Sequence, residues 1–575
     1  MGGRDRAVAT VTAAAVTAAV LLAAGCGSGK GGAGGQAGGA QRGSAGSTGT
    51  AKPGGTLHVL AATTFEHLDP ARCYVTNGED VSRLIYRTLT TYSAAAGPDG
   101  GKIVPDLATD LGTPTDDAKT WTFHLKDGLK YEDGTAITAA DVKYGVERSF
   151  ADILPEGAPY ARMWLAGGDK YQGPYKDKNG LASIETPDDR TVVFHLNRPI
   201  ADFGSTVSLP VFSPVPQAKD TGVNYDQHPV SDGPYKIASY DPKSKLVLVR
   251  NTGWSKESDQ VRKALPDRIE FELGLDTAVV DQRMIAAAGA DADAVAMEPI
   301  GAASVAKVQN DPALKKRLVV SGSTSSRFLS LNTTHKPLDN AKVRQAIAFA
   351  LDKDALRLTR GGPIAGDIAT GLIPKSVAGY VPDDPYATPN AQGDPAKAKQ
   401  LLADAGFPNG IDVTLDLPGT ATGKAQGEAI QESLGKAGIR VKLNEVPSSS
   451  FWSTEETVAQ EHDMVIDGWT PDWTGPSTLL PTILDGRLIT PQGNNNRAMY
   501  SSPEVQRRFD EIAAMSDVTA ADQAYGELSR QIMADAPIVP FLWDKAAVLV
   551  GPHVTGAYGH VAYVGRLDLV SLGLS

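Results

Sequence analysis

Nine histidines, two cysteines and the glycine-rich segments are where catalytic chemistry would be easiest to recognise in this 575-residue chain. The histidines never stand four residues apart and no His-Glu-x-x-His occurs, so a helical metal site of the hydrolase type has no support. No Gly-x-Ser-x-Gly nucleophile motif is present. Gly423-Lys424 precedes Ala425 instead of Ser or Thr, which excludes a phosphate-binding loop. The sequence therefore predicts a protein that is not an enzyme and has neither a metal site nor a cofactor.

The two cysteines, Cys26 and Cys73, are too few for a disulfide framework. Cys73 is expected to be a buried structural residue. Cys26 has a different context, because it follows a basic start and an uncharged stretch from Ala7 to Gly25 that is typical of an export signal. The segment Leu22–Cys26 resembles the lipobox of bacterial lipoproteins, although Ala23 stands where that motif more often has Leu. This resemblance implies cleavage before Cys26 and a lipid on its thiol, so that the protein is anchored on the extracytoplasmic face of the cell membrane.

Composition narrows the remaining function classes. The net charge is −12, which leaves no basic surface for nucleic acid and none for charge-driven attachment to anionic lipid. A 41% hydrophobic chain of this length is expected to fold into two or more lobes. Residues 1–25 are predicted to be the signal peptide and residues 26–53, rich in Gly and Ser, a flexible tether.

Hydrophobic periodicity predicts alternating strands and helices from residue 56 onward. Expected strands include 56–60, 121–125, 192–196 and 439–443. Helices are expected after a capping box at Thr138, over 342–351, over 395–405 and over 428–437, the last two ending at Gly406 and Gly438. A helix, a glycine stop and then a strand is the pattern of an α/β fold.

The motifs of the chain resemble those of one family, the extracytoplasmic solute-binding proteins of ABC importers, in the peptide/nickel-binding group. The matching segments occur in the family's order, from Gly54 to about Pro552. They are Leu68-Asp69-Pro70, Val104–Ala108, Trp121–Phe150, Gly233–Lys236, Arg250-Asn251-x-x-Trp254, Asn332, Val343–Ala346, Leu351–Lys353 and Gly468–Trp473. A segment over 362–388 has no counterpart among these motifs.

This resemblance implies an α/β, two-lobe clamp of the large type II periplasmic-binding-protein class, with an additional third domain. Lobe I would comprise residues 54–90, 215–320 and 545–575. The additional domain would be residues 91–214, and lobe II residues 321–544. Two lobes joined by crossing segments suit a hinge that closes over a ligand.

The resemblance also implies ligand-binding residues. In peptide-binding members the aspartate of the segment 468–473 accepts the ligand's α-ammonium group, which assigns that role to Asp472; the alternative is an aspartate that caps a turn. Trp469 and Trp473 flank it and are expected to form walls of the ligand cavity, or else to belong to the core. Asn494, in the run Asn494–Arg497, is expected at the pocket mouth unless this run is a solvated loop.

The function implied is that of a lipid-anchored, monomeric substrate-binding component of an ABC importer. It would capture a peptide or peptide-like solute outside the cell and deliver it to permease subunits driven by separate ATPases. Three alternatives remain at this point. The first is the same fold with an oligosaccharide, a metal chelate or an antibiotic as its ligand. The second is a surface sensor, and the third is a hydrolase whose lobes form the substrate cleft.

Overall fold

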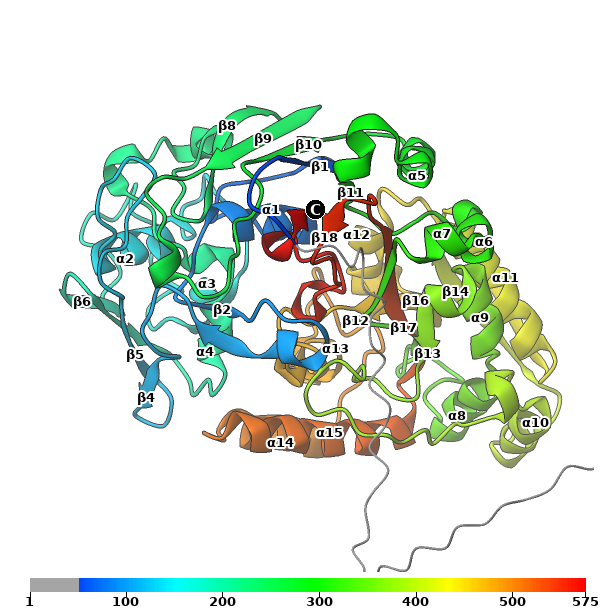
Figure 1. Cartoon of the computed structure of the whole chain (residues 1–575). Helices are drawn as coiled ribbons and strands as arrows, with labels where there is room; N and C mark the ends of the chain where they lie inside the picture. The colour runs from blue at the N-terminus through cyan, green and yellow to red at the C-terminus, as the bar shows by residue number, and fades with distance from the viewer. Residues whose placement is uncertain (1–50) are drawn as a thin grey trace, which may run out of the picture. The chain divides into compact units, whose positions relative to one another are not determined.

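Three β-sheets organise the protein in a computed structural model that describes residues 51–575 (Figure 1). Cys26, the predicted signal peptide and nearly all of the predicted tether lie outside the described residues. We name each part by its sheet: the first lobe holds a five-stranded sheet, the second lobe a six-stranded sheet, and the third domain a four-stranded antiparallel sheet. The domain boundaries expected from the sequence stay a prediction.

The strands in spatial order are as follows. The first lobe has β11 (Ala294–Ala296), β1 (Thr56–Leu60), β10 (Arg268–Glu272), β9 (Lys245–Arg250) and β8 (Tyr235–Asp241). The second lobe has β13 (Gly366–Ile368), β17 (Ile538–Leu549), β12 (Leu318–Leu331), β16 (Met464–Trp469), β14 (Ile411–Pro418) and β15 (Ile439–Val446). The third domain has β4 (Thr113–Thr115), β5 (Thr120–His124), β7 (Thr191–His195) and β6 (Ile184–Asp188). Two small pairs are β2 (Thr90–Tyr92) with β3 (Ile103–Pro105), and β18 (Val554–Thr555) with β19 (Gly573–Leu574).

The α-helices connect these strands. They are α1 (Thr76–Ile85), α2 (Ala139–Arg148), α3 (Tyr160–Trp164), α4 (Phe203–Thr206), α5 (Thr277–Ala286), α6 (Ala302–Asn310), α7 (Pro312–Lys315), α8 (Ala341–Ala350), α9 (Lys353–Thr359), α10 (Pro395–Asp404), α11 (Ala421–Gly435), α12 (Phe451–Glu455), α13 (Leu480–Leu484), α14 (Pro503–Ala513) and α15 (Val518–Asp535). Between residues 51 and 575, none of these helices is long and apolar enough to cross a membrane.

The local sequence signals are largely confirmed. β1 has the predicted bounds, and α2 begins at the capping box that Thr138 and Asp141 form. The helix predicted over 428–437 is wrong at its start, because α11 begins at Ala421, where the Thr420 side chain accepts a hydrogen bond from the Gly423 amide. Gly423 and Gly427 lower the helix propensity of this first part, and tertiary packing overrides it: both glycines are buried, and the space a Cβ would need beside Gly427 is taken by Leu417.

Two long antiparallel strands, β12 and β17, serve both lobes. Their halves at Leu318–Val319 and Ala547–Val550 pack in the core of the first lobe. Their other halves, at Phe328–Leu331 and Ile538–Leu542, pack in the core of the second lobe. The pairing register shifts between Gly322 and Ser326, between these two parts. A β-bulge bends a strand, so this shift gives the two lobes a natural hinge line.

A buried ion pair fastens the third domain to the first lobe. The Arg148 guanidinium, at the end of α2, donates to both carboxylate oxygens of Asp69 at 2.7 and 2.8 Å, and Asp220 lies 3.2 Å from it. Neither Arg148 nor Asp69 has any exposed side chain. Removing one partner would leave a buried charge unpaired, so this contact holds the third domain in one place.

Candidate ligand-binding site

Strand β16 places Asp472 at the meeting point of the three parts. The strand is paired with β12 and β14 in the interior of the six-stranded sheet and ends at Trp469. Beyond it, the Asp472 amide donates to the Thr478 hydroxyl at 3.0 Å and the Trp469 indole donates to the Thr478 carbonyl at 2.9 Å. These bonds fold the chain back on itself, which fixes the Asp472 side chain outside the second lobe's own core.

Two tyrosines from the other two parts donate to the Asp472 carboxylate. The Tyr74 hydroxyl, just before α1 of the first lobe, lies 2.5 Å from one oxygen. The Tyr160 hydroxyl, at the start of α3 in the third domain, donates to the other. Burial raises the pKa of the Asp472 carboxyl, and the two hydroxyl donors oppose that shift. Asp472 therefore joins three separate parts of the fold through one enclosed carboxyl group.

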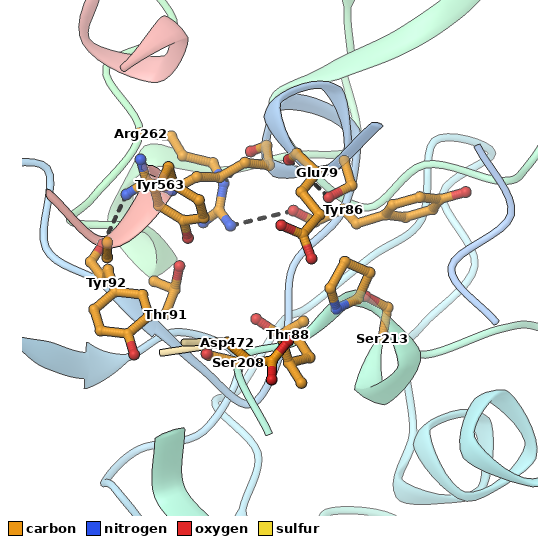
Figure 2. A pocket seen from close by; sticks show the side chains of 15 residues that line it. Glu79, Tyr86, Thr88, Thr91, Tyr92, Ser208, Ser213, Arg262, Asp472 and Tyr563 are labelled. Carbon is orange, nitrogen blue, oxygen red and sulfur yellow. Dashed lines mark hydrogen bonds between the residues drawn. The ribbon is translucent and has the colours of Figure 1, made fainter. Parts of the chain in front are cut away.

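Asp472 also lines a small cavity of about 40 Å³ (Figure 2). The lining residues come from α1 and the chain after it, from the third domain near Ser208, from Arg262 and from the C-terminal segment. They are Glu79, Ser82, Arg83, Tyr86, Thr88, Thr91, Tyr92, Ser208, Leu209, Pro210, Ser213, Arg262, Asp472, Ala562 and Tyr563. A cavity with aromatic walls and a few convergent polar groups is the usual form of a small-molecule site.

The positive charges of this cavity are already paired. Arg83 donates to Asp568 and to the Tyr92 carbonyl. Arg262 lies within 2.9 Å of Asp106 and 3.1 Å of Asp259. The Glu79 carboxylate, by contrast, has no hydrogen-bond or ion-pair partner among the described residues. Among the described residues, Glu79 and Asp472 are therefore the carboxyl groups of the wall that have no cationic partner, and we call this space the acidic cavity.

The two tryptophans lie beside this cavity and not among its lining residues. Trp473 is 2% exposed and packs in the core of the third domain, with its ring 5.1 Å from that of Tyr160. Its indole donates to Asp202 at 2.8 Å. Trp469 packs against the core of the second lobe. The prediction that they wall the cavity finds no support here; Trp473 instead holds the Asp472 segment against the third domain.

Asn494 is not brought to the cavity. It is fully buried inside the second lobe, where its amide donates to Glu461 at 2.9 Å and to the Asn496 carbonyl at 3.2 Å. Neither a pocket mouth nor a solvated loop describes it, because Asn496 and Arg497 are buried as well. The physical reason is that each of these polar groups finds a partner within the lobe.

A second, larger cavity, of about 340 Å³, lies between the first and second lobes and is basic. Arg327, Arg360, Lys545 and Arg566 line it, and Asp544 is the one carboxylate among its lining residues. Both cavities share α1 and the C-terminal segment, since Glu79 and Tyr563 line the first while Thr76 and Arg566 line the second. An acidic and a basic cavity thus lie on the same two elements.

Other sequence expectations concern thiols and metals. Cys73 is 1% exposed, and burial raises the pKa of its thiol well above the usual range, as befits a structural cysteine. Over residues 51–575, no group of His, Cys, Asp or Glu has a geometry that could hold a metal ion. The predicted lipidation site, Cys26, lies outside the described residues.

Sequence reasoning missed Tyr74, Tyr160 and Glu79. Tyr74 and Tyr160 stand 398 and 312 positions from Asp472, so no spacing rule connects them. Glu79 is an acidic residue in the first turn of α1. Such a residue is common there because a negative charge stabilises a helix N-terminus, so nothing in the sequence indicates a ligand-binding role for it. Only the folded arrangement distinguishes these three residues from their neighbours.

Comparison with known proteins agrees with this architecture. Residues 102–489 match the family described as bacterial extracellular solute-binding proteins, family 5. The chain is 26% identical over 506 residues to the glutathione-binding protein GsiB of Salmonella paratyphi A, covering 87% of this chain and 91% of that protein. It is 26% identical over 500 residues to the di/tripeptide-binding protein 1 of Pseudomonas aeruginosa, covering 82% and 86%.

A solved structure, clavulanic acid biosynthesis oligopeptide binding protein 2, superposes with a TM-score of 0.86 at 33% identity, covering 93% of this chain and 99% of that one. This chain belongs to the bacterial extracellular solute-binding proteins of family 5. The family resemblance read from the motifs and the α/β multi-domain clamp fold are both confirmed. Both relatives are named as binding proteins.

Proposed function

We propose that this protein is the lipid-anchored substrate-binding component of an ABC importer, which captures peptides or peptide-like solutes outside the cell and delivers them to a permease. Family membership supports the solute-binding role. The names of its relatives, which refer to glutathione, di- and tripeptides and oligopeptides, support the ligand class. The single observation that carries the proposal is the half-buried Asp472 carboxyl, which has no cationic partner and faces a cavity where three parts of the fold meet.

A carboxylate in this position suits the α-ammonium group of a peptide. A cation taken out of water needs a charged partner, and Asp472 is held in place by two hydroxyls and by the Thr478 contact. In the neighbouring basic cavity Arg327 and Arg360 share one carboxylate, Asp544, at 2.8 and 3.6 Å, so these two positive charges have room for a second carboxylate. A ligand with a free ammonium at one end and a carboxylate at the other fits this arrangement of charges.

The test combines a protein variant with a ligand modification. Calorimetry would measure the binding of two ligands, Lys-Ala-Ala and its N-terminally acetylated form. Each would be tested against the wild-type full chain in detergent and against the Asp472→Ala variant. Burying an unpaired ammonium costs roughly 2–5 kcal/mol, so Asp472→Ala should bind the free peptide roughly 30-fold to several-thousand-fold more weakly. N-acetylation should lower the affinity of the wild type strongly and that of the variant only slightly, because acetylation and the substitution remove the same contact.

Additive losses in that cycle would show that Asp472 does not anchor an amine. Failure of the free peptide to bind the wild type would favour a non-peptide solute, such as an oligosaccharide or a metal chelate. Native mass spectrometry of the purified chain would then identify the solute that co-purifies. Asp472→Asn is a milder variant that keeps the side-chain shape, and its loss should be smaller than that of the alanine variant.

The anchor is tested separately. Acylation of Cys26 would be the only membrane contact of a chain whose described helices cannot span a bilayer. Cys26→Ala should therefore be secreted as a monomer that still binds Lys-Ala-Ala. Retention of this variant in salt-washed membranes would contradict the lipid anchor and would leave the ligand proposal unaffected.

A further inference from the structure

We propose that Glu79 is a second cation-binding group of the acidic cavity, and that it selects ligands with a positive charge beside their terminal ammonium, such as a peptide whose first residue is lysine or arginine. This inference rests on the proposed function and goes one step beyond it. Asp472 accounts for one ammonium group, whereas the cavity contains two carboxylates that the protein leaves without a cation.

The charge balance around Glu79 is the first argument. Every arginine near it is committed elsewhere: Arg83 to Asp568, Arg262 to Asp106 and Asp259, and Arg566 to Asp80. Figure 2 shows the Glu79 carboxyl directed from α1 into the open part of the cavity, on the side where Asp472 and Thr88 lie. A carboxylate that points into a cavity without a partner is stabilised when a cation binds beside it.

The aromatic side chains around Glu79 are the second argument. Tyr86, Tyr92 and Tyr563 line the same cavity. The Tyr86 hydroxyl donates to the Leu68 carbonyl and the Tyr92 hydroxyl accepts from the Thr474 amide, which fixes both rings. Aromatic faces combined with carboxylates are the usual surroundings of a bound ammonium or guanidinium group.

Electrostatics supports the same reading. Burial raises the pKa of the Glu79 carboxyl to about 8, and the charges of Asp472 and Asp80 add to this effect while Arg566 opposes it. Two like charges in one enclosed space disfavour each other's ionised form. A ligand that brings two positive charges relieves both carboxyls at once, whereas a ligand with one leaves the second carboxyl protonated or unpaired.

The experiment compares two peptides that differ in one charge. Binding of Lys-Ala-Ala and of norleucine-Ala-Ala, which has a neutral side chain of similar length, would be measured by calorimetry on the full chain. We expect the wild type to prefer the lysine peptide by about tenfold or more. Glu79→Gln should remove most of this preference, and Glu79→Asp, which keeps the charge on a shorter side chain, should retain part of it.

The matched control is Glu432→Gln, which removes a carboxylate with 75% side-chain exposure on the second lobe and should keep the full preference. Equal binding of the two peptides by the wild type would overturn the inference, and so would a preference that survives in Glu79→Gln. If that variant did not fold, the wild-type ratio alone would decide. Failure of both peptides to bind would instead refute the proposed function, so the two failures are distinguishable.

Discussion

Two groups of carboxyl side chains in this protein both contain members with raised pKa values, yet one group is half-buried beside a cavity and the other is fully buried inside a lobe. The cavity pair, Glu79 and Asp472, lines the space between the lobes. The sealed cluster, which we define as Glu455, Glu461, Asp467, Asn494 and Arg497, lies inside the second lobe. Burial raises the pKa of Glu79 and of Glu455 to about 8 and that of Glu461 to about 7.

The difference lies in what can reach these carboxyls. The side chain of Arg497 donates to Asp467 at 2.8 Å and lies 4.9 Å from the ring of Trp452, so the sealed cluster contains its own cation. Glu455 is 1% exposed, and neither of its carboxyl oxygens has a hydrogen-bond partner. A raised pKa therefore reports burial in both places, and of the two groups only the cavity pair lies where a ligand can reach it.

The largest effect that would test this contrast is on stability. Arg497→Met removes the only cation of the sealed cluster and leaves the Asp467 carboxylate buried without its partner, at a cost of about 3–5 kcal/mol. Scanning calorimetry should show a markedly lower unfolding temperature, while the folded fraction keeps its affinity for Lys-Ala-Ala. Arg440→Met, which breaks an exposed ion pair with Asp412, is the control and should leave the unfolding temperature unchanged. Weaker peptide binding at unchanged stability would mean that the sealed cluster belongs to the ligand site.

A smaller effect of opposite sign is expected at Glu455. Its pKa is about 8 in the folded protein against 4.5 for the ordinary carboxyl, so the folded state binds the extra proton and stability falls as pH rises from about 4.5 to 8. Glu455→Gln should therefore raise the unfolding free energy by about 2–4 kcal/mol at pH 8 and by little at pH 5. Unfolding by urea at the two pH values measures this difference, with the exposed Glu432→Gln as control. An equal gain at both pH values would show that the carboxyl is not protonated in the fold.

These two regions also show what the sequence can and cannot predict. The start of α2, just after Thr138, and the end of α10, just before Gly406, were both predictable. A capping box and a glycine stop each act within one turn of the helix. The clamp fold was predictable from motif order. The ligand-binding role of Asp472 stays a prediction that rests on the family resemblance, since nothing in the spacing of residues 468–473 marks it as a ligand group.

The misplaced residue, Asn494, shows the limit in physical terms. Four consecutive polar residues, Asn494–Arg497, suggest a wet loop, yet three of them are buried because Glu461, Asp467 and the Tyr500 carbonyl satisfy them. The burial of a polar residue cannot be predicted from the local sequence pattern when its hydrogen-bond partners lie some thirty positions away. The same holds for Tyr74 and Tyr160, whose role appears only when three parts of the fold close on Asp472.

The finest distinction between the two regions is the pH dependence of binding. In the free protein Glu79 has a pKa of about 8, and a bound cation favours its ionised form, so binding of Lys-Ala-Ala should release a proton below pH 8. Affinity should then rise with pH by up to about tenfold per unit, equivalent to 1.4 kcal/mol, as far as about pH 8. Above that pH it should fall, because the α-ammonium of the peptide, whose ordinary pKa is about 8, loses its proton.

Calorimetry between pH 5.5 and 8.5, in buffers of different ionisation enthalpy, measures both the slope and the protons released. Glu79→Gln should lose most of the slope, and what remains belongs to Asp472, whose pKa burial also raises. Glu455→Gln should keep the full slope, although Glu455 has a similar pKa, because no ligand atom can approach it inside the second lobe. Identical slopes in the wild type and in Glu79→Gln would mean that another group titrates and that Glu79 does not belong to the site. Loss of the slope in Glu455→Gln would show that the two regions are coupled through the hinge strands.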